Sequence, residues 1–188
     1  MASERFAIVA TALAGLSVVT RIKLGDSRGF LMRMYGAGEL EVAGFTDPVV
    51  QINSTVTAQR GTIRGMHFQH PPSAEGKFVS VLRGEVFDVA VDIRQGSPTF
   101  LQWHGELLSA DNCRSLFIPK GFAHGFQTLT PDCTLLYLHT AAYDAGREGG
   151  LNPFDPRLAI DWPLPVADLS QRDHGHPNLT ETFLGITP

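Results

Sequence analysis

The sequence predicts an all-β fold, either a sandwich or a barrel. Two observations lead to this prediction. The 188 residues include 19 glycines and 12 prolines, and these residues separate short runs of alternating or β-branched residues. The length lies within the usual range for one domain, so we expect residues 1–188 to form a single domain.

The expected strands follow from these runs. In order they are 6–23 (one or two strands, broken at Gly15), 31–35, 49–56, 62–69, 77–82, 85–94, 100–108, a pair within 116–126, and 135–139. Residues 25–30 read as a turn that leads into the strand over 31–35. We expect the strands over 49–56 and 62–69 to be neighbours, and those over 77–82 and 85–94 to meet at a tight turn. Beyond Tyr143, closely spaced glycines and prolines predict an irregular tail over the β core, with helical turns at 153–158 or 164–169.

Composition and charge exclude several classes of protein. A formal net charge of -4 and a pI near 5.9 leave no basic stripe, so we expect no nucleic-acid partner. Cys113 and Cys133 are too few for a disulfide framework or a zinc knuckle, and we expect both to be reduced and buried. No run is long enough to span a membrane. Residues 6–19 could be a signal peptide, but Thr11 interrupts the apolar run, and we interpret it as a strand.

Residues 60–77 contain an unusual density of functional side chains. His67 lies in a short apolar run, with Arg64 before it and Gln69 and Lys77 after it. One predicted hairpin would then hold a base, an anion binder and a second cation. A single histidine in a strand is more often a hydrogen-bonded structural residue, so the density is suggestive rather than decisive.

Two further strands carry polar groups of interest. In the strand over 85–94, Asp88 and Asp92 share a face with small apolar residues; solvent exposure is the ordinary alternative, and we single out only Asp88. In the motif Pro119-x-Gly121-x-x-His124, proline and glycine make a turn and the histidine enters the next strand. We expect His124 to face the interior of a barrel.

Many short segments carry a resemblance to a known family. They include Gly-Thr-Ile-Arg-Gly-Met-His-Phe-Gln at 61–69 and Ile-Pro-Lys-Gly-Phe-Ala-His-Gly-Phe at 118–126, together with 26–30, 51–54, 76–77, 84–94, 96–100, 136–137, 152–156, 160–163 and 169–173. In this order they resemble the dTDP-4-dehydrorhamnose 3,5-epimerases and cover about residues 15–175. The resemblance implies a cupin-type jelly-roll barrel with N-terminal strands in 1–24 and a short, partly helical C-terminal tail over the barrel at 164–188. It also implies a cytoplasmic homodimer without a cofactor or a metal.

The chemistry of such an epimerase agrees with the residues present. In a nucleotide-linked 4-keto-6-deoxyhexose, C3 and C5 both flank the C4 carbonyl, so removing a hydrogen from either gives a stabilised enolate. The enzyme needs a base, a proton donor on the other face and a positive group at the carbonyl oxygen. By resemblance, His67 is the base, Asp173 fixes its tautomer, Tyr137 is the donor and Lys77 lies beside the enolate oxygen. Core packing for Tyr137 and surface positions for Lys77 and Asp173 are the alternatives.

The resemblance also implies the residues that bind a dTDP-linked sugar. Guanidinium groups suit phosphate oxygens, so Arg28 and Arg64 are the expected diphosphate contacts. The other expected substrate contacts are Gln51, Asn53, Gln69, His124 and Tyr143. Arg33 stands where the family usually has a glutamate near the nucleotide base, which puts the usual thymidine recognition in doubt.

Three alternatives stay open. The first is a single-site epimerase that acts at C3 or C5 of another 4-keto nucleotide sugar. The second is a metal-dependent cupin enzyme, although His67 and His70 are three residues apart and the usual metal motif needs two histidines one residue apart. The third is a sugar-binding barrel without activity. The presence of His67, Tyr137 and Asp173 together favours double epimerisation.

Overall fold

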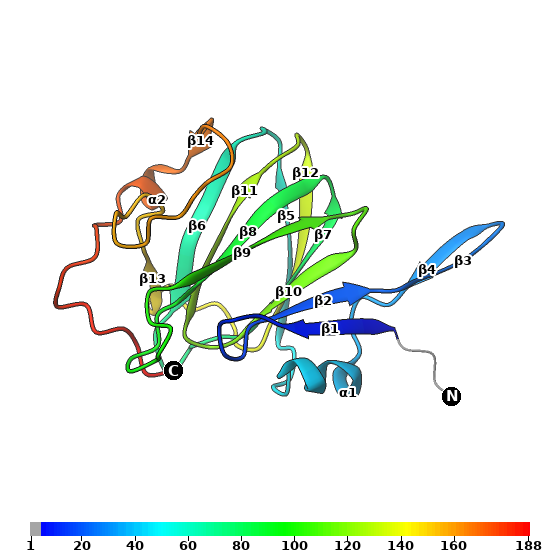
Figure 1. Cartoon of the computed structure of the whole chain (residues 1–188), viewed down its shortest axis with the longest axis horizontal. Coiled ribbons are helices and arrows are strands. Elements are labelled where there is room, and N and C mark those ends of the chain that lie inside the picture. Colours follow the sequence, from blue (N-terminus) through cyan, green and yellow to red (C-terminus); the bar gives the residue numbers. More distant parts are fainter. Residues whose placement is uncertain (1–4) are drawn as a thin grey trace.

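The computed structural model describes residues 5–188 and confirms the predicted all-β fold (Figure 1). One sheet has the strand order β1 (Phe6–Ala10), β2 (Ser17–Arg21), β10 (Arg114–Ile118), β7 (Lys77–Arg83), β12 (Cys133–His139) and β5 (Gln51–Thr57). The other has the order β13 (Glu148–Gly150), β6 (Thr62–Gln69), β11 (Phe122–Thr128), β8 (Glu85–Asp92) and β9 (Trp103–Ser109), and β14 (Asp168–Leu169) pairs in parallel with β6. The two sheets face each other as a jelly roll.

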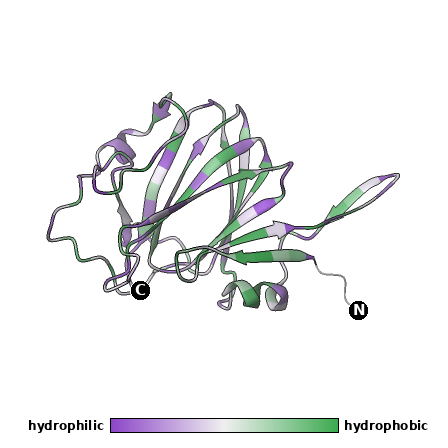
Figure 2. Ribbon diagram, viewed as in Figure 1, coloured by the Kyte–Doolittle hydropathy of each residue, from purple (hydrophilic) through white to green (hydrophobic). Residues whose placement is uncertain are grey.

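The inner faces of the two sheets form the main hydrophobic core. Strand alternation turns every second residue inward, so Val79 and Leu135 from the first sheet pack in one cluster with Val86, Ala90 and Phe126 from the second. Figure 2 shows the hydrophobic residues concentrated along the strands, and hydrophilic residues in the short helix near the C-terminus. The core therefore fixes the separation of the two walls between which the site lies.

The outer face of the second sheet is covered by the C-terminal part of the chain. Val89 and Val91 of β8 point outward and pack in a second cluster with Leu151, Leu158 and Ile186. Both faces of β8 are therefore buried, which is why its sequence is apolar on both sides. The tail includes the short helix α2 (Gln171–His174). At the start of this helix the Ser170 hydroxyl accepts a hydrogen bond from the Asp173 N–H at 3.0 Å.

The remaining elements lie at the other end of the molecule. Helix α1 (Ala37–Leu40) and the 3-10 helix η1 (Glu41–Ala43) cover the outer face of the first sheet, where Leu40 packs with Phe78 and Phe117. The hairpin of β3 (Lys23–Asp26) and β4 (Gly29–Met32) projects away from the body of the molecule (Figure 1).

Several sequence-based expectations about pairing were wrong. The strands β5 and β6 lie in different sheets, and so do β7 and β8, because the chain of this jelly roll crosses from one sheet to the other at both connections. The chain changes sheet at Gly61 and Gly84, both of which have the left-handed backbone (φ +82° and +79°) that favours glycine. The predicted hairpin over 60–77 is therefore two strands from opposite walls.

Some predicted boundaries were also wrong. The strand expected over 31–35 is the β3–β4 hairpin over 23–32, and the strand expected from residue 100 begins at Trp103. The second helix lies at 171–174, after both predicted helical segments, because Ser170 caps it and Pro163 and Pro165 interrupt the earlier run. The strand over 62–69 has the predicted bounds, and both cysteines are free and buried as predicted.

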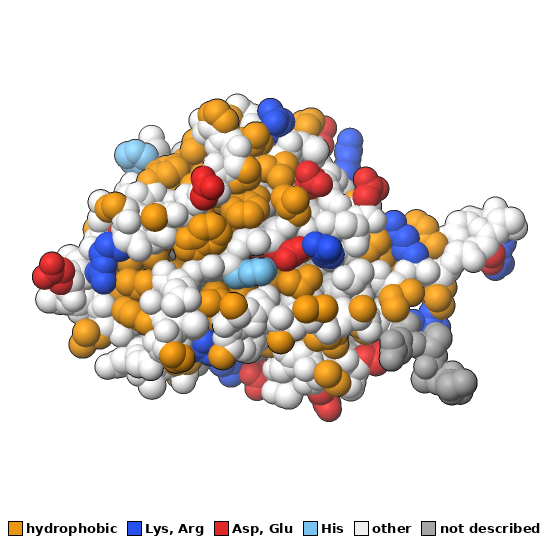
Figure 3. All heavy atoms as spheres, viewed as in Figure 1, with side chains coloured by type: hydrophobic (Ala, Val, Ile, Leu, Met, Phe, Trp, Pro, Cys, Tyr) orange, Lys and Arg blue, Asp and Glu red, His pale blue; other side chains and the backbone are white. Residues whose placement is uncertain are grey.

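Charged side chains of both signs are spread over the face shown in Figure 3. On that face Lys and Arg side chains are interspersed with Asp and Glu and do not gather into one basic area (Figure 3). Among the residues that the structure describes, no helix is both long and apolar enough to cross a membrane.

Candidate active site

A pocket of about 260 Å³ lies between the two sheets. Its walls come from strands of both sheets, which brings together residues that are far apart in the sequence. Of the predicted site residues, it is lined by Asn53, Arg64, His67, Gln69, Lys77, His124, Tyr137 and Tyr143. The predicted cluster thus forms mainly because β6 and β11 of one sheet face β5, β7 and β12 of the other.

The central pair of the pocket is His67 and Asp173. His67 Nε2 lies 2.8 Å from Asp173 Oδ1, and the other carboxylate oxygen accepts the Gly65 N–H at 3.1 Å. Burial alone would raise the pKa of Asp173, but the His67 hydrogen bond and charge, the Gly65 N–H and the Arg172 charge outweigh it and lower the pKa to about 2. An ionised carboxylate can only accept, so His67 carries its hydrogen on Nε2. Its Nδ1 is then the basic atom.

Arg172 lies beside this pair and was not anticipated from the sequence. Its guanidinium Nε is 3.3 Å from Asp173 Oδ1, its Nη2 is 3.0 Å from His67 Nε2, and its Nη1 contacts Glu148 at 3.1 Å. Because Nε2 points its hydrogen at Asp173, the guanidinium acts there as a neighbouring positive charge. Arg64, His67 and Arg172 also line an adjoining hollow of about 400 Å³, so these residues stand where two cavities meet.

Tyr137 approaches from the opposite wall. It belongs to β12 of the first sheet and is buried, whereas His67 belongs to β6 of the second sheet. Burial, followed by the negative charge of Asp88, raises the pKa of Tyr137 well above its ordinary value. The phenol is therefore protonated at neutral pH and can serve as a proton donor facing the histidine base across the pocket.

Lys77 supplies a positive charge between these two walls. Its Nζ lies 3.3 Å from the carbonyl oxygen of His67 and 3.2 Å from Glu75 Oε1. Burial would raise the pKa of Glu75, but the hydrogen bond from His139 and the charge of Lys77 outweigh it and lower that pKa. The ammonium is thus held by an ionised carboxylate in a nearly buried position beside the base.

A second histidine–carboxylate pair lies deeper in the pocket. His124 Nε2 is 3.0 and 2.9 Å from the two oxygens of Asp88, and both side chains are buried. His124 on β11 is the direct cross-strand partner of His67 on β6. The expectation that His124 faces the interior is correct, and the carboxylate singled out at Asp88 is buried.

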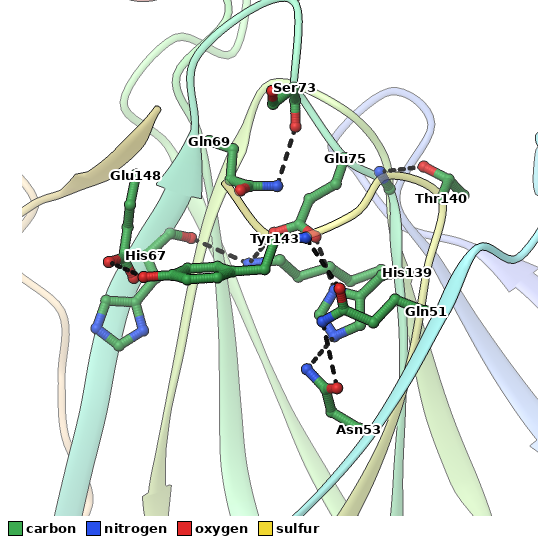
Figure 4. A network of polar contacts seen from close by, with 12 residues as sticks. Gln51, Asn53, His67, Gln69, Ser73, Glu75, His139, Thr140, Tyr143 and Glu148 are labelled. Carbon is green, nitrogen blue, oxygen red and sulfur yellow. Dashed lines mark hydrogen bonds and ion pairs between the residues drawn. The ribbon is translucent and has the colours of Figure 1, made fainter. Parts of the chain in front are cut away.

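The rim of the pocket is held by amide side chains. Gln69 accepts the Asp144 N–H at 2.7 Å and donates to the Ala142 carbonyl at 3.2 Å, while Gln51 accepts the Tyr143 N–H at 2.9 Å. Tyr143 donates its hydroxyl to Glu148 at 3.0 Å (Figure 4). Gln51 is not one of the residues that line the cavity; its side chain contacts the backbone of the rim residue Tyr143.

The structure does not bring Arg28 to this pocket. Arg28 is an exposed residue of the β3–β4 hairpin and pairs with Asp26 at 2.5 Å. Arg33, which stands where the family usually has an acid, forms an ion pair with Glu39 at 2.5 Å. Contact of Arg28 with the diphosphate therefore stays a prediction, and within a single copy of the chain Arg28 does not reach the pocket.

Pocket residues that sequence reasoning missed are Glu75, His139, Glu148 and Arg172. A signal existed for His139, which was given no role. Alternate residues of a strand point to the same side, so a pocket-facing Tyr137 places His139 on the pocket side as well. Glu75 and Glu148 lie in or beside irregular segments, where spacing says little about direction.

One group of possible metal ligands occurs among residues 5–188. The ligand atoms of His67, Asp173 and His176 lie within 4.8 Å of one another. A cation there would meet the guanidinium of Arg172, which contacts both His67 and Asp173. His67 Nε2 is also already bonded to Asp173. The donor set therefore fits a metal poorly, which weakens the metal-dependent alternative.

A jelly roll that places a histidine–aspartate pair opposite a protonated tyrosine defines an acid–base enzyme. A family model described as dTDP-4-dehydrorhamnose 3,5-epimerase matches residues 10–181. The chain belongs to the dTDP-4-dehydrorhamnose 3,5-epimerase family, a family of isomerases.

Individual relatives agree with this assignment. A dTDP-4-dehydrorhamnose 3,5-epimerase from Sinorhizobium fredii is 41% identical over 90% of this chain and 87% of its own length. A dTDP-4-dehydrorhamnose 3-epimerase from Streptomyces niveus is 38% identical over 86% and 78%. The structure of a dTDP-6-deoxy-D-glucose-3,5-epimerase from Legionella pneumophila, in complex with dTDP-4-keto-L-rhamnose, matches with a TM-score of 0.90 and 42% identity over 97% of this chain and 98% of its own.

Proposed function

We propose that this protein inverts C3 and C5 of dTDP-4-dehydro-6-deoxyglucose to give dTDP-4-dehydrorhamnose. The observation that carries the proposal is the opposition of the His67–Asp173 pair and Tyr137 across one pocket, with the Lys77 ammonium beside the base. The names of the relatives supply the sugar and the nucleotide.

The proposed reaction needs only proton transfers. His67 Nδ1 removes the hydrogen at C3 or C5, and the electron pair of that C–H bond moves onto the C4 oxygen as an enolate. The Lys77 ammonium stabilises the oxygen, and ionised Asp173 stabilises the imidazolium. Tyr137 returns a proton to the carbon from the opposite face, which inverts it. Exchange with solvent then removes the extra proton from His67 and restores the one that Tyr137 gave.

The diphosphate is proposed to lie where the two cavities meet. Arg64 and Arg172 line both cavities there, and guanidinium groups bind phosphate oxygens well. The sugar then occupies the pocket between the sheets, with Asn53, His124 and Tyr143 along its walls.

We also propose a cytoplasmic homodimer. The β3–β4 hairpin carries Arg28 away from its own pocket, so this arginine can meet a diphosphate only in a second copy of the chain. The strand β1 is the edge strand of its sheet, as an N-terminal strand that adds to a neighbour's sheet must be. Sedimentation of the wild type and of a variant lacking the hairpin tip tests the assembly.

The first experiment is proton NMR of dTDP-4-keto-6-deoxyglucose in deuterated water with the purified, chelator-treated enzyme. Deuterium at both C3 and C5 supports the proposal. Deuterium at neither carbon rejects this substrate, and restoration of exchange only after adding a divalent metal favours the metal-dependent alternative.

A single-site epimerase is the second candidate, because the relative from Streptomyces niveus is named a 3-epimerase. Deuterium at only one carbon supports that candidate. The variant Tyr137→Phe sharpens the distinction: we expect it to exchange the C3 hydrogen but no longer invert C5. A product mixture unchanged from wild type removes Tyr137 from the donor role.

A further inference from the structure

The pocket holds a polar network that the proposed reaction does not use. It runs from the rim to Lys77 through Gln51, Asn53, His139 and Glu75 (Figure 4). The successive separations are 3.2 Å from Gln51 Nε2 to Asn53 Oδ1, 3.4 Å from Asn53 Nδ2 to His139 Nε2, 2.7 Å from His139 Nδ1 to Glu75 Oε2, and 3.2 Å from Glu75 Oε1 to Lys77 Nζ. The side chains of Glu75, Lys77 and His139 are nearly buried.

The contacts at the rim fix the direction of every bond in this network. Gln51 Oε1 accepts the Tyr143 N–H, so the Gln51 amide nitrogen faces Asn53 and donates to its oxygen. The Asn53 amide nitrogen is then the atom that faces His139 Nε2 and donates to it. His139 therefore keeps its hydrogen on Nδ1 and donates it to Glu75. All donors match acceptors only when His139 is neutral.

Protonation of His139 disturbs this network at both ends. A hydrogen on Nε2 would face the Asn53 amide hydrogens, so Asn53 and then Gln51 would have to turn, and Gln51 would lose the Tyr143 N–H. The imidazolium would also compete with the Lys77 ammonium for Glu75. Tyr137, whose ring stacks on His139 at a centroid distance of 5.9 Å, is protonated and supplies no negative charge to compensate the imidazolium.

The other charged groups of the pocket leave Glu75 as the partner of His139. Glu148 is taken up by Arg172 and Tyr143, Asp88 by His124, and Asp173 by His67. Arg64 and Arg172 are the remaining cations of the lining. Of the carboxylates that line the pocket, Glu75 is thus the one in contact with both His139 and Lys77.

We propose that Glu75 and His139 are positioning residues for Lys77. Glu75 holds the ammonium beside the carbonyl oxygen of His67, and His139 ties that carboxylate to the rim residue Tyr143. The inference rests on the proposed function, since Lys77 stabilises the enolate there. Neutral His139 keeps the network closed, and its protonation opens it.

Kinetics against pH test the pair. The variants are Glu75→Gln and His139→Gln, and the control is His104→Gln, which alters a histidine–carboxylate contact on β9 outside the pocket. We expect Glu75→Gln to lower kcat by about tenfold or more with little change in KM, since small displacements of a catalytic group are costly.

His139→Gln should behave differently, because glutamine can still donate to Glu75 but does not titrate. We expect its kcat at pH 8 to fall less than that of Glu75→Gln. On the acid side, the fall of log kcat should be shallower in His139→Gln than in wild type, because glutamine at this position cannot be protonated and the network stays closed. If both variants match His104→Gln in kcat and in pH profile, the inference is wrong.

A second measurement does not depend on the substrate. Nitrogen-15 NMR of the histidine side chains, assigned with His139→Gln, should show neutral His139 with its hydrogen on Nδ1 in wild type. That preference should disappear in Glu75→Ala. A hydrogen on Nε2 in wild type overturns the inference even if the enzyme is active. Wild type that lacks C3 and C5 exchange but shows the Nδ1 tautomer contradicts the proposed function alone.

Discussion

Two of the histidine–carboxylate pairs at the pocket, His67–Asp173 and His124–Asp88, have their histidines on directly paired strand positions but differ in almost every other respect. His67 and His124 face each other across β6 and β11. The His67 side chain is 26% exposed, and its carboxylate arrives from α2, more than a hundred residues away. The His124 side chain is 6% exposed, and Asp88 comes from the adjacent strand β8.

From this difference we expect His67 to react and His124 to have a structural role. The His67 ring lines the pocket and its contacts with Asp173 and Arg172 are on Nε2, so in the proposed reaction Nδ1 takes up a proton while ionised Asp173 compensates the charge. In the deeper pair both oxygens of Asp88 are occupied by His124. The charge of Asp88 acts instead on Tyr137, whose pKa it helps to raise after burial. In the proposed reaction, its greater access to solvent makes His67, and not His124, the base.

The largest expected effect breaks the open pair. His67→Ala should lower the rate of C3 and C5 exchange by at least about a hundredfold, because a positioned general base contributes that much or more. Deuterium incorporation followed by NMR measures the rate, with His104→Ala as the control. A loss smaller than about tenfold would mean that His67 is not the base.

The second prediction breaks the buried pair. Asp88→Ala should lower the free energy of unfolding by about 3 kcal/mol, because His124 loses its partner in a site that excludes water. Urea denaturation followed by fluorescence measures the change. The control is Glu106→Ala, whose contacts with His104 and Arg114 lie outside the pocket and should cost about 1 kcal/mol or less. Equal losses in the two variants would contradict the assigned role of burial.

The third prediction concerns acid stability. The folded pKa of Asp173 is about 2, below the unfolded value of about 3.9. The carboxylate therefore stabilises the fold above about pH 4, and this contribution is lost as the pH falls toward about 2. Because the His67–Asp173 pair is partly open to solvent, we expect the ionised carboxylate to contribute about 1–2 kcal/mol to the free energy of unfolding. Between pH 7 and pH 2, the free energy of unfolding from urea denaturation should fall more with decreasing pH for wild type than for Asp173→Asn.

The smallest expected effect is that of replacing Arg172, which lies beside the His67–Asp173 pair. Arg172 contacts both members of the open pair and Glu148, and its side chain is half exposed. Arg172→Gln should raise KM by about two- to fivefold and leave stability almost unchanged, because exposed ion pairs contribute little. A matched change far from the pocket, Arg114→Gln, should alter neither quantity. A large loss of stability in Arg172→Gln would show that Asp173 depends on the guanidinium for its place.

The sequence predicted the parts of the molecule that depend on local pattern. The bounds of β6 followed from its apolar run, and the inward direction of His124 followed from the turn before it. Sheet partners did not follow, since β5 and β6 are adjacent in the chain but belong to different sheets. The His67–Asp173 contact spans 106 residues and came only from resemblance, because no local rule places α2 beside β6.

The irregular C-terminal segment combines two tasks that are usually separate. Its apolar residues seal the outer face of the second sheet, and its short helix delivers Asp173 to His67. The correct tautomer of the base therefore exists only in molecules whose tail is docked. Docking of such a segment can be lost at denaturant concentrations too low to unfold the sheets. Catalytic activity should then be lost in dilute urea, when the tail undocks, before the two sheets unfold. The urea concentration at which activity is lost measures the local stability of the tail.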